Sequence, residues 1–356
     1  MSSPENSTDE LREAIREVLS HRSESYLSDV RSGRLGEAER ALWAEAAQLG
    51  WLGLGVEERY GGLGLGFAGL AVLYEELGRA LAPLPVLSTL LAAEAFSVAG
   101  TDELKEQWLP RIASGEIRAA IALPVSGQTL PRVAADGGIT GSVPNVLRGE
   151  TPDLLLLPVR SESGRVSLAI FGCEDAGIAI QATPVIDLTR MLCTVNLDRA
   201  RVAPACLLDL DDAQWNRLLN HASVALACDS VGGADEILAR TVAYMGVRMQ
   251  FGRPIGSFQA LKHRAATWKI VLEGARALTG HAAGMLARQD PGASACASAA
   301  KASACDVYTA IAGDAIQLHD GIGFTWEHDC HLFIKRARLN AVLFGTPVQH
   351  RERVAG

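Results

Sequence analysis

Residues 317–346 read QLHDGIGFTWEHDCHLFIKRARLNAVLFGT, and this stretch decides how the rest of the chain is interpreted. It follows an apolar helical segment and enters a turn that contains Gly321 and Gly323. Glycine lets backbone N–H groups approach a ligand closely, so such a turn suits a phosphate group. A helix C-cap followed by a plain turn is the simpler explanation of an isolated Gly-x-Gly. The surrounding chain must therefore decide between the two.

The composition describes an ordinary globular protein. With 356 residues, 48% hydrophobic and 21% charged, the chain can form two or three domains. A net charge of -8 argues against nucleic acid or an anionic membrane as the main partner. The polar start and the lack of a long apolar run predict no secretory signal, no membrane span and a cytoplasmic location. Seven scattered cysteines without a CxxC pair predict reduced thiols and no metal site.

Residues 1–118 are predicted to form an α-helical N-terminal domain. Ser7 and Glu10 have the spacing of a capping box, and apolar residues then recur at helical intervals. A second helical run ends at Gly50, and a glycine cluster follows at residues 61–66. That cluster is interpreted as a connection between helices, because no strand precedes it and no Gly-Lys-Ser/Thr follows it, as a nucleotide-binding loop requires.

The pattern changes near residue 119 and again near residue 212. Residues 119–211 contain short β-type runs, such as LLLLPV and VSLAIF, separated by turn formers, and predict a small β-barrel or sandwich. Residues 212–356 return to helical periodicity and predict a helical bundle, with helices at residues 214–249, 261–288, 297–318 and 330–342. The chain is therefore predicted to be an α+β multidomain protein in the order helices, strands, helices.

Two motifs in the last domain resemble acyl-CoA dehydrogenases. Residues 248–263, RMQFGRPIGSFQALKH, are similar to that family's flavin motif in their Arg, Phe-Gly, Ile and Phe-Gln positions. The stretch at residues 317–346 is similar to a second family pattern, Gln-x-x-Gly-Gly-x-Gly followed some twenty residues later by Glu-Gly-Thr. The chain is thus identified as a member, which implies the acyl-CoA dehydrogenase fold with a middle β-barrel and a C-terminal four-helix bundle.

The resemblance also implies FAD shared across a dimer, with the isoalloxazine ring on one subunit and the pyrophosphate and adenine on its neighbour. Residues on the ring side differ from the family, since LPVSGQTLP stands at 123–131, and Asn145, Val146 and Leu147 replace a Trp-Ile-Thr segment. Asp320 replaces a glycine and is expected to weaken flavin binding by repelling the pyrophosphate. The residues that keep the family pattern, and are predicted to bind the cofactor, are Arg248, Phe251, Gln259, Gln317, Gly321 and Thr346.

The family's catalytic base is missing from both of its usual positions. Phe344 stands where most members have the glutamate that removes the α-proton, and Ala222 stands where other members have it. The positions that often contact coenzyme A carry Asn220 and Ser223. Glu327 and Asp329 are interpreted as a polar turn that opens a helix. The sequence therefore predicts no catalytic residue on this chain.

These observations favour a subunit of an FAD-dependent acyl-CoA dehydrogenase, an oxidoreductase that desaturates an acyl-CoA thioester between its α and β carbons. A paralogous partner would bind the ring and the acyl-CoA and bring the glutamate, in a heterotetramer. The ending resembles the non-catalytic partner of paired bacterial dehydrogenases that act on steroid side chains. Two alternatives remain open: a structural subunit that binds no flavin, and a self-sufficient flavoenzyme of different chemistry, such as a monooxygenase.

Overall fold

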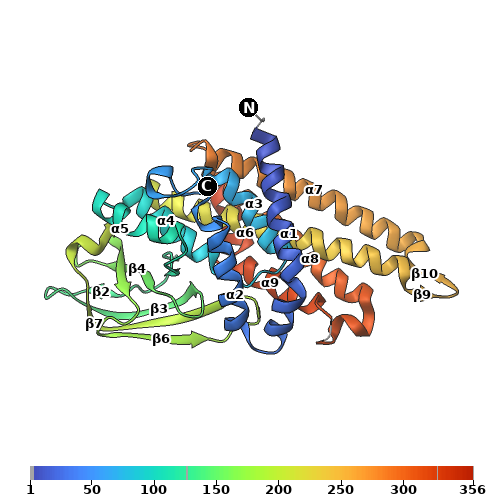
Figure 1. Cartoon of the computed structure of the whole chain (residues 1–356), viewed down its shortest axis with the longest axis horizontal. Coiled ribbons are helices and arrows are strands. Elements are labelled where there is room, and N and C mark those ends of the chain that lie inside the picture. Colours follow the sequence, from blue (N-terminus) through green and yellow to red (C-terminus); the bar gives the residue numbers. More distant parts are fainter. Residues whose placement is uncertain (1–3, 126, 327, 356) are drawn as a thin grey trace.

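The computed structural model describes residues 4–125, 127–326 and 328–355. Helices come first, strands follow, and long helices complete the chain, so the predicted order is confirmed. The sheet lies at one side of the molecule, and α6, α7 and α8 extend away from it toward the β9–β10 hairpin (Figure 1). In the described part of the chain, no helix is both long and apolar enough to cross a membrane.

The N-terminal segment is helical, as predicted. Helix α1 begins at Pro4, three residues before Ser7, so it starts earlier than the capping-box spacing of Ser7 and Glu10 predicts. The glycine cluster folds as a tight connection, in which a Cβ on Gly62 would lie 2.0 Å from the carbonyl oxygen of Val56. The helices of this segment are α1 (Pro4–Arg31), α2 (Leu35–Gln48), α3 (Gly66–Arg79), α4 (Val86–Ala99) and α5 (Asp102–Ala113).

The strands of the middle segment form one eight-stranded sheet in the order β6-β7-β3-β1-β4-β5-β8, with β2 pairing with both β3 and β4. The ladder between β3 and β7 shifts between Val143 and Val146, so Pro144 and Asn145 leave the regular pairing. Leu155, Leu157 and Val195 are buried on one face of the sheet. The strands are β1 (Ala119–Ile121), β2 (Arg132–Val133), β3 (Gly138–Arg148), β4 (Leu154–Arg160), β5 (Val166–Gly172), β6 (Ile178–Thr183), β7 (Met191–Arg201) and β8 (Leu207–Asp209).

Helix α6 is the centre of the C-terminal bundle. It opens with a capping box between Asp211 and Gln214, and its middle part is buried. Helix α3 packs closely against it, because a Cβ on Gly232 would lie only 1.9 Å from the carbonyl oxygen of Glu75. The elements are α6 (Asp212–Val247), β9 (Met249–Gln250), β10 (Arg253–Pro254), α7 (Gln259–Ala287), α8 (Ala293–His319), η5 (Asp320–Phe324), α9 (Cys330–Val342) and α10 (Pro347–Ala355).

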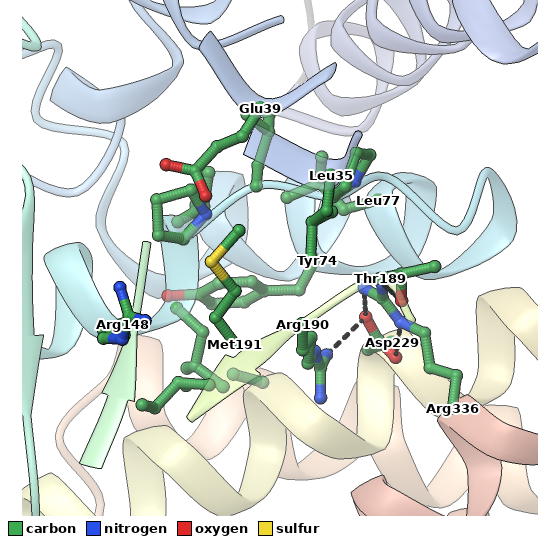
Figure 2. Close-up of a pocket in the computed structure, with 17 residues that line it drawn as sticks. Leu35, Glu39, Tyr74, Leu77, Arg148, Thr189, Arg190, Met191, Asp229 and Arg336 are labelled. Carbon is green, nitrogen blue, oxygen red and sulfur yellow. Dashed lines mark hydrogen bonds and ion pairs between the residues drawn. The ribbon is translucent and has the colours of Figure 1, made fainter. Parts of the chain in front are cut away.

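Asp229 on α6 connects the three segments of the chain. Its carboxylate accepts hydrogen bonds from Arg336 of α9 at 2.5 and 3.1 Å, and from Arg190, which precedes β7, at 2.9 Å (Figure 2). Arg336 also donates to the carbonyl of Ala82, in the loop after α3, at 3.2 Å. Burial alone would raise the pKa of Asp229, but the two guanidinium groups and the hydrogen bonds hold it at about 2. The carboxylate is therefore ionised and buried at the junction.

Candidate functional site

Five of the six predicted cofactor residues lie at one end of the bundle. Helix α6 ends immediately before Arg248, and Gln259 begins α7. Tyr244 in the last full turn of α6 stacks on His319 at the end of α8, with ring centroids 4.4 Å apart. The stack brings the ends of α6 and α8 together. Gln317, near the end of α8, and Gly321, in η5, consequently lie at the end of the bundle from which the β9–β10 hairpin with Phe251 extends.

All five of these residues face solvent. Gln259, Gln317 and Gly321 are exposed, and Phe251 has 89% of its surface exposed. The hydrogen bonds of Arg248 to other described residues are made by its backbone. Its N–H donates to the carbonyl of Tyr244 at 2.9 Å, and its carbonyl accepts from the N–H of Ile255 at 2.8 Å. Its guanidinium group is thus available to an anion from outside the chain.

The turn of the β9–β10 hairpin holds Phe251 in an unfavourable backbone conformation. Its φ is 52° and that of Gly252 is 77°, so both residues at the turn are left-handed. A non-glycine residue in that region costs roughly 1–3 kcal/mol. The strain directs an aromatic ring into solvent, and strain of this kind is usual at ligand-binding positions. Phe258 meets the ring edge-on, with centroids 6.1 Å apart. The hairpin therefore presents Phe251 to a group outside this chain.

Asp320 occupies a backbone position that glycine would fill more easily. Its φ of 55° and ψ of -144° lie close to a region that is nearly restricted to glycine. The residue is exposed and directly precedes Gly321. Its carboxylate therefore stands beside the turn that is predicted to hold a pyrophosphate, where like charges repel.

Thr346 does not join the other five. It lies between α9 and α10 and caps α10, because its hydroxyl accepts from Gln349 N–H at 3.3 Å while Gln349 accepts from the Thr346 N–H at 2.8 Å. His350 of α10 contacts Ser298 near the start of α8, at 3.2 Å. Gln317 lies 19 residues further along α8, which is about 28 Å at 1.5 Å per residue. Thr346 thus belongs to a different part of the molecule.

A cavity of about 670 Å³ lies between the sheet and the α9–α10 junction, close to Thr346. Leu123, Asn145 and Phe344 line it, and Asn145 adopts a left-handed φ of 58° at the bulge of β3. Val146 and Leu147, the next two residues on that strand, are buried in the core. No aspartate or glutamate is among the described residues that line this cavity.

The two positions where the family has its base have different surroundings. Phe344, with a φ of 55°, is half-buried and lies in the wall that the large cavity shares with a neighbouring cavity of about 470 Å³. Ala222 has no exposed surface and packs in the core with Leu218. Glu352 is the carboxylate among the described residues around the second cavity, and it is exposed on α10.

The residues at the expected coenzyme A positions bond within the chain. Asn220 donates to the Ser294 hydroxyl at 2.8 Å, and the Ser223 hydroxyl donates to the carbonyl of Leu219 at 2.6 Å. Both side chains are buried.

In the polar turn before α9, Asp329 forms ion pairs that connect helices. This carboxylate pairs with Arg31 of α1 and, at 3.1 Å, with Arg240 of α6. Glu327, the other carboxylate considered there, lies outside the described residues.

Sequence reasoning missed the residues that complete the large cavity. They include Thr183, the last residue of β6, residues 184–186 in the loop that follows, and Arg338 on the outer face of α9. No sequence signal identifies them, because their role depends on how the sheet packs against α9.

The enclosed pocket in Figure 2 is a different space. It lies between Glu39, Tyr74, Arg148 and Met191. Its volume of about 30 Å³ holds a water molecule or two. It is too small for a flavin ring or an acyl chain.

Comparisons with known proteins decide the family. The acyl-CoA dehydrogenase N-terminal domain matches residues 5–116, and the acyl-CoA dehydrogenase C-terminal domain matches residues 212–356. The chain belongs to the acyl-CoA dehydrogenase family. Acyl-CoA dehydrogenase IpdE2 of Mycolicibacterium smegmatis is 33% identical over 97% of this chain and 98% of its own length. The predicted family and an oxidoreductase of the acyl-CoA dehydrogenase type are thereby confirmed. FAD is the cofactor of this family.

Solved structures agree with this assignment. The Tcur3481-Tcur3483 steroid ACAD matches with a TM-score of 0.88 and 28% identity, over 98% of this chain and 97% of that one. The ChsE4-ChsE5 complex from Mycobacterium tuberculosis matches with a TM-score of 0.87 and 24% identity, over 97% of this chain and 96% of that one, which shows the shared fold.

Proposed function

We propose that this acyl-CoA dehydrogenase chain is the non-catalytic subunit of a hetero-oligomer that desaturates an acyl-CoA thioester. The observation that carries the proposal is the group of exposed residues at the end of the bundle, Arg248, Phe251, Gln259, Gln317 and Gly321. They fit the pyrophosphate and adenine of a FAD whose ring lies on another chain. FAD is proposed from the chemistry of these residues. They offer a free guanidinium group, two side-chain amides, a glycine backbone that a ligand can approach closely, and an aromatic ring.

The role of each residue follows from its contacts. Arg248 offers a cation that no described residue neutralises, so it would hold the pyrophosphate. Phe251 would lie against a planar ring, and the strained hairpin fixes its direction before binding. Gln259 and Gln317 would direct their amides toward the same group. When bound, FAD accepts the hydride that leaves the β-carbon of the substrate.

The partner subunit is needed to remove the α-proton of the substrate. Removing the α-proton requires a positioned base, which contributes roughly 10² to 10⁴ in rate. Phe344 cannot accept a proton, Ala222 is sealed in the core, and the described lining of the large cavity contains no carboxylate. We therefore assign the base and the acyl-CoA to a paralogous subunit.

The substrate class is proposed from the similarity of this chain to a solved structure. The steroid ACAD named above shares this fold at 28% identity over 98% of the chain, and we propose a steroid or similarly bulky acyl-CoA as the substrate. We also propose a cytoplasmic location, which the seven free cysteines support.

The test uses the chain co-expressed with a candidate paralogous partner. Arg248→Ala is expected to leave the complex assembled, as measured by its mass in solution, while its bound flavin falls at least tenfold. Arg199→Ala, at an exposed arginine of the sheet, is the matched control and should keep its flavin. Full flavin content in Arg248→Ala would contradict the shared site. A chain that purifies alone with flavin would instead favour a self-sufficient flavoenzyme.

A further inference from the structure

Three side chains of metal-binding type meet at the end of the bundle where α6 and α8 end. His319 ends α8, Cys330 begins α9, and His328 lies between them, after η5. One potential ligand atom from each of the three lies within 4.8 Å of the others. We propose that His319, His328 and Cys330 form a site for a transition-metal ion of the zinc type. This site is independent of whether the chain binds FAD.

His319 is already oriented as a ligand. Its Nδ1 lies 2.8 Å from the carbonyl oxygen of Ala315, so Nδ1–H donates there and Nε2 keeps its lone pair. A backbone carbonyl on the far nitrogen is the usual way in which proteins fix a metal-binding imidazole. The ring is 2% exposed and is held between Tyr244 and His328, whose ring centroids lie 4.4 and 4.7 Å away. Its position is therefore set before any ion arrives.

His328 and Cys330 can both approach the same point. His328 is partly exposed, and its Nδ1 accepts a long hydrogen bond of 3.3 Å from the backbone N–H of Cys330, which is easily given up. Cys330 has no exposed surface. Asp329 between them is held by Arg31 and Arg240 and is not counted as a ligand.

The donor set selects the kind of ion. Two imidazole nitrogens and one thiolate suit Zn²⁺ or Cu⁺ and do not suit Mg²⁺ or Ca²⁺, which take oxygen ligands. Zinc bonds of about 2.0–2.3 Å would bring the three ligand atoms within about 3.3–3.8 Å of one another. The ligand atoms, which lie within 4.8 Å of one another, must therefore close by at most about 1–1.5 Å. Three protein ligands leave a fourth position for water or another donor.

The position of the site gives the ion a structural role. Its ligands lie on both sides of η5, the segment that contains Gly321. A bound ion would tie the end of α8 to the start of α9 and hold the turn between them. It would thus fix the backbone that faces the proposed pyrophosphate.

The test is a titration of the chelator-treated full chain with Zn²⁺ and with Co²⁺ as its spectroscopic substitute. We expect one equivalent to bind, with a thiolate-to-cobalt charge-transfer band and the strong visible bands of four-coordinate Co²⁺. Cys330→Ser should lose the charge-transfer band, and His328→Ala should weaken binding about tenfold or more. His281→Ala and Cys296→Ser, which change a histidine and a cysteine outside the cluster, should behave as the parent.

Circular dichroism of each variant separates loss of a ligand from loss of the fold. His328 is the partly exposed member, so His328→Ala is expected to keep the parent's melting temperature without metal. The proposal is overturned if the parent binds less than one equivalent. It is also overturned if Co²⁺ binds without the charge-transfer band, or if the folded variants at His328 and Cys330 bind as the parent does.

Discussion

Replacing Asp229 by asparagine tests how the three segments of the chain are joined. The change keeps the shape of the side chain and removes the carboxylate charge with which two guanidinium groups form ion pairs. The side chains of Arg190 and Arg336 are only 8% and 3% exposed, so water cannot replace the carboxylate. Removing one partner of such a buried pair costs about 3–5 kcal/mol.

The expected shift in melting temperature follows from the size of the chain. For 356 residues the entropy of unfolding is about 0.75 kcal/mol/K, so Asp229→Asn should lower the melting temperature by about 4–7 °C. Asp306→Asn is the matched control, since Asp306 also pairs with an arginine, Arg351, but the two side chains are 49% and 58% exposed. A surface pair contributes about 0–1 kcal/mol, and the control should melt within about 1 °C of the parent.

The pH dependence provides a second check. The folded pKa of Asp229, about 2, is below its ordinary value of 3.8, so its contribution is present above pH 4 and is lost as the pH falls toward 2. Between pH 5 and 8 the difference in melting temperature between Asp229→Asn and the parent should therefore stay constant. Thermal unfolding followed by circular dichroism measures both quantities. If Asp229→Asn melts like the Asp306 control, the carboxylate does not hold the segments together and the reasoning fails.

Three further predictions concern other contacts. Burial raises the pKa of Glu39 to about 6, so its ionisation destabilises the folded parent as the pH rises through that value. The melting temperature of Glu39→Gln relative to that of the parent should therefore rise by about 3 °C from pH 5 to pH 7, and an unchanged difference would contradict this. Gly232→Ala should cost about 1–3 kcal/mol, since its Cβ meets the Glu75 carbonyl, while Gly313→Ala, which meets nothing within 4 Å, should be neutral or stabilising in chemical denaturation. Phe251→Gly should melt like the parent, because glycine accepts the left-handed φ, yet lower the flavin content of the co-expressed complex; unchanged flavin would remove Phe251 from the site.

Hydrophobic periodicity was sufficient to predict the long helices and several strands. Helix α9 was predicted with the same bounds, 330–342, because its apolar residues recur at helical spacing. Strand β3 was not recognised, since its 11 residues contain two glycines and a proline that usually end strands. The structure accommodates them with a bulge at Pro144 and Asn145. Helix α10 was also missed, although Thr346 and Pro347 form a typical helix start.

Two motifs, at residues 248–263 and 317–323, were sufficient to predict five residues that the structure places at one end of the bundle, and their role in binding flavin stays a prediction. Arg248 and Phe251 belong to a recognisable run, and the structure places both on the surface as a shared site requires. The separation of Thr346 from them could not be predicted, because it depends on α10 folding back along α8. The cluster of His319, His328 and Cys330 was likewise not predicted, because its spacing matches no regular metal motif and η5 determines how the side chains meet.

The β9–β10 hairpin also affects how the chain behaves in a cell. Val247, Met249 and Phe251 are 74%, 53% and 89% exposed in and beside the hairpin, a group of apolar side chains with no cover from this chain. Under the proposed assembly, the partner and the shared cofactor cover them. A chain made in excess of its partner would keep this surface open to aggregation and to proteases. Its steady-state abundance is therefore expected to follow the abundance of the subunit that completes it.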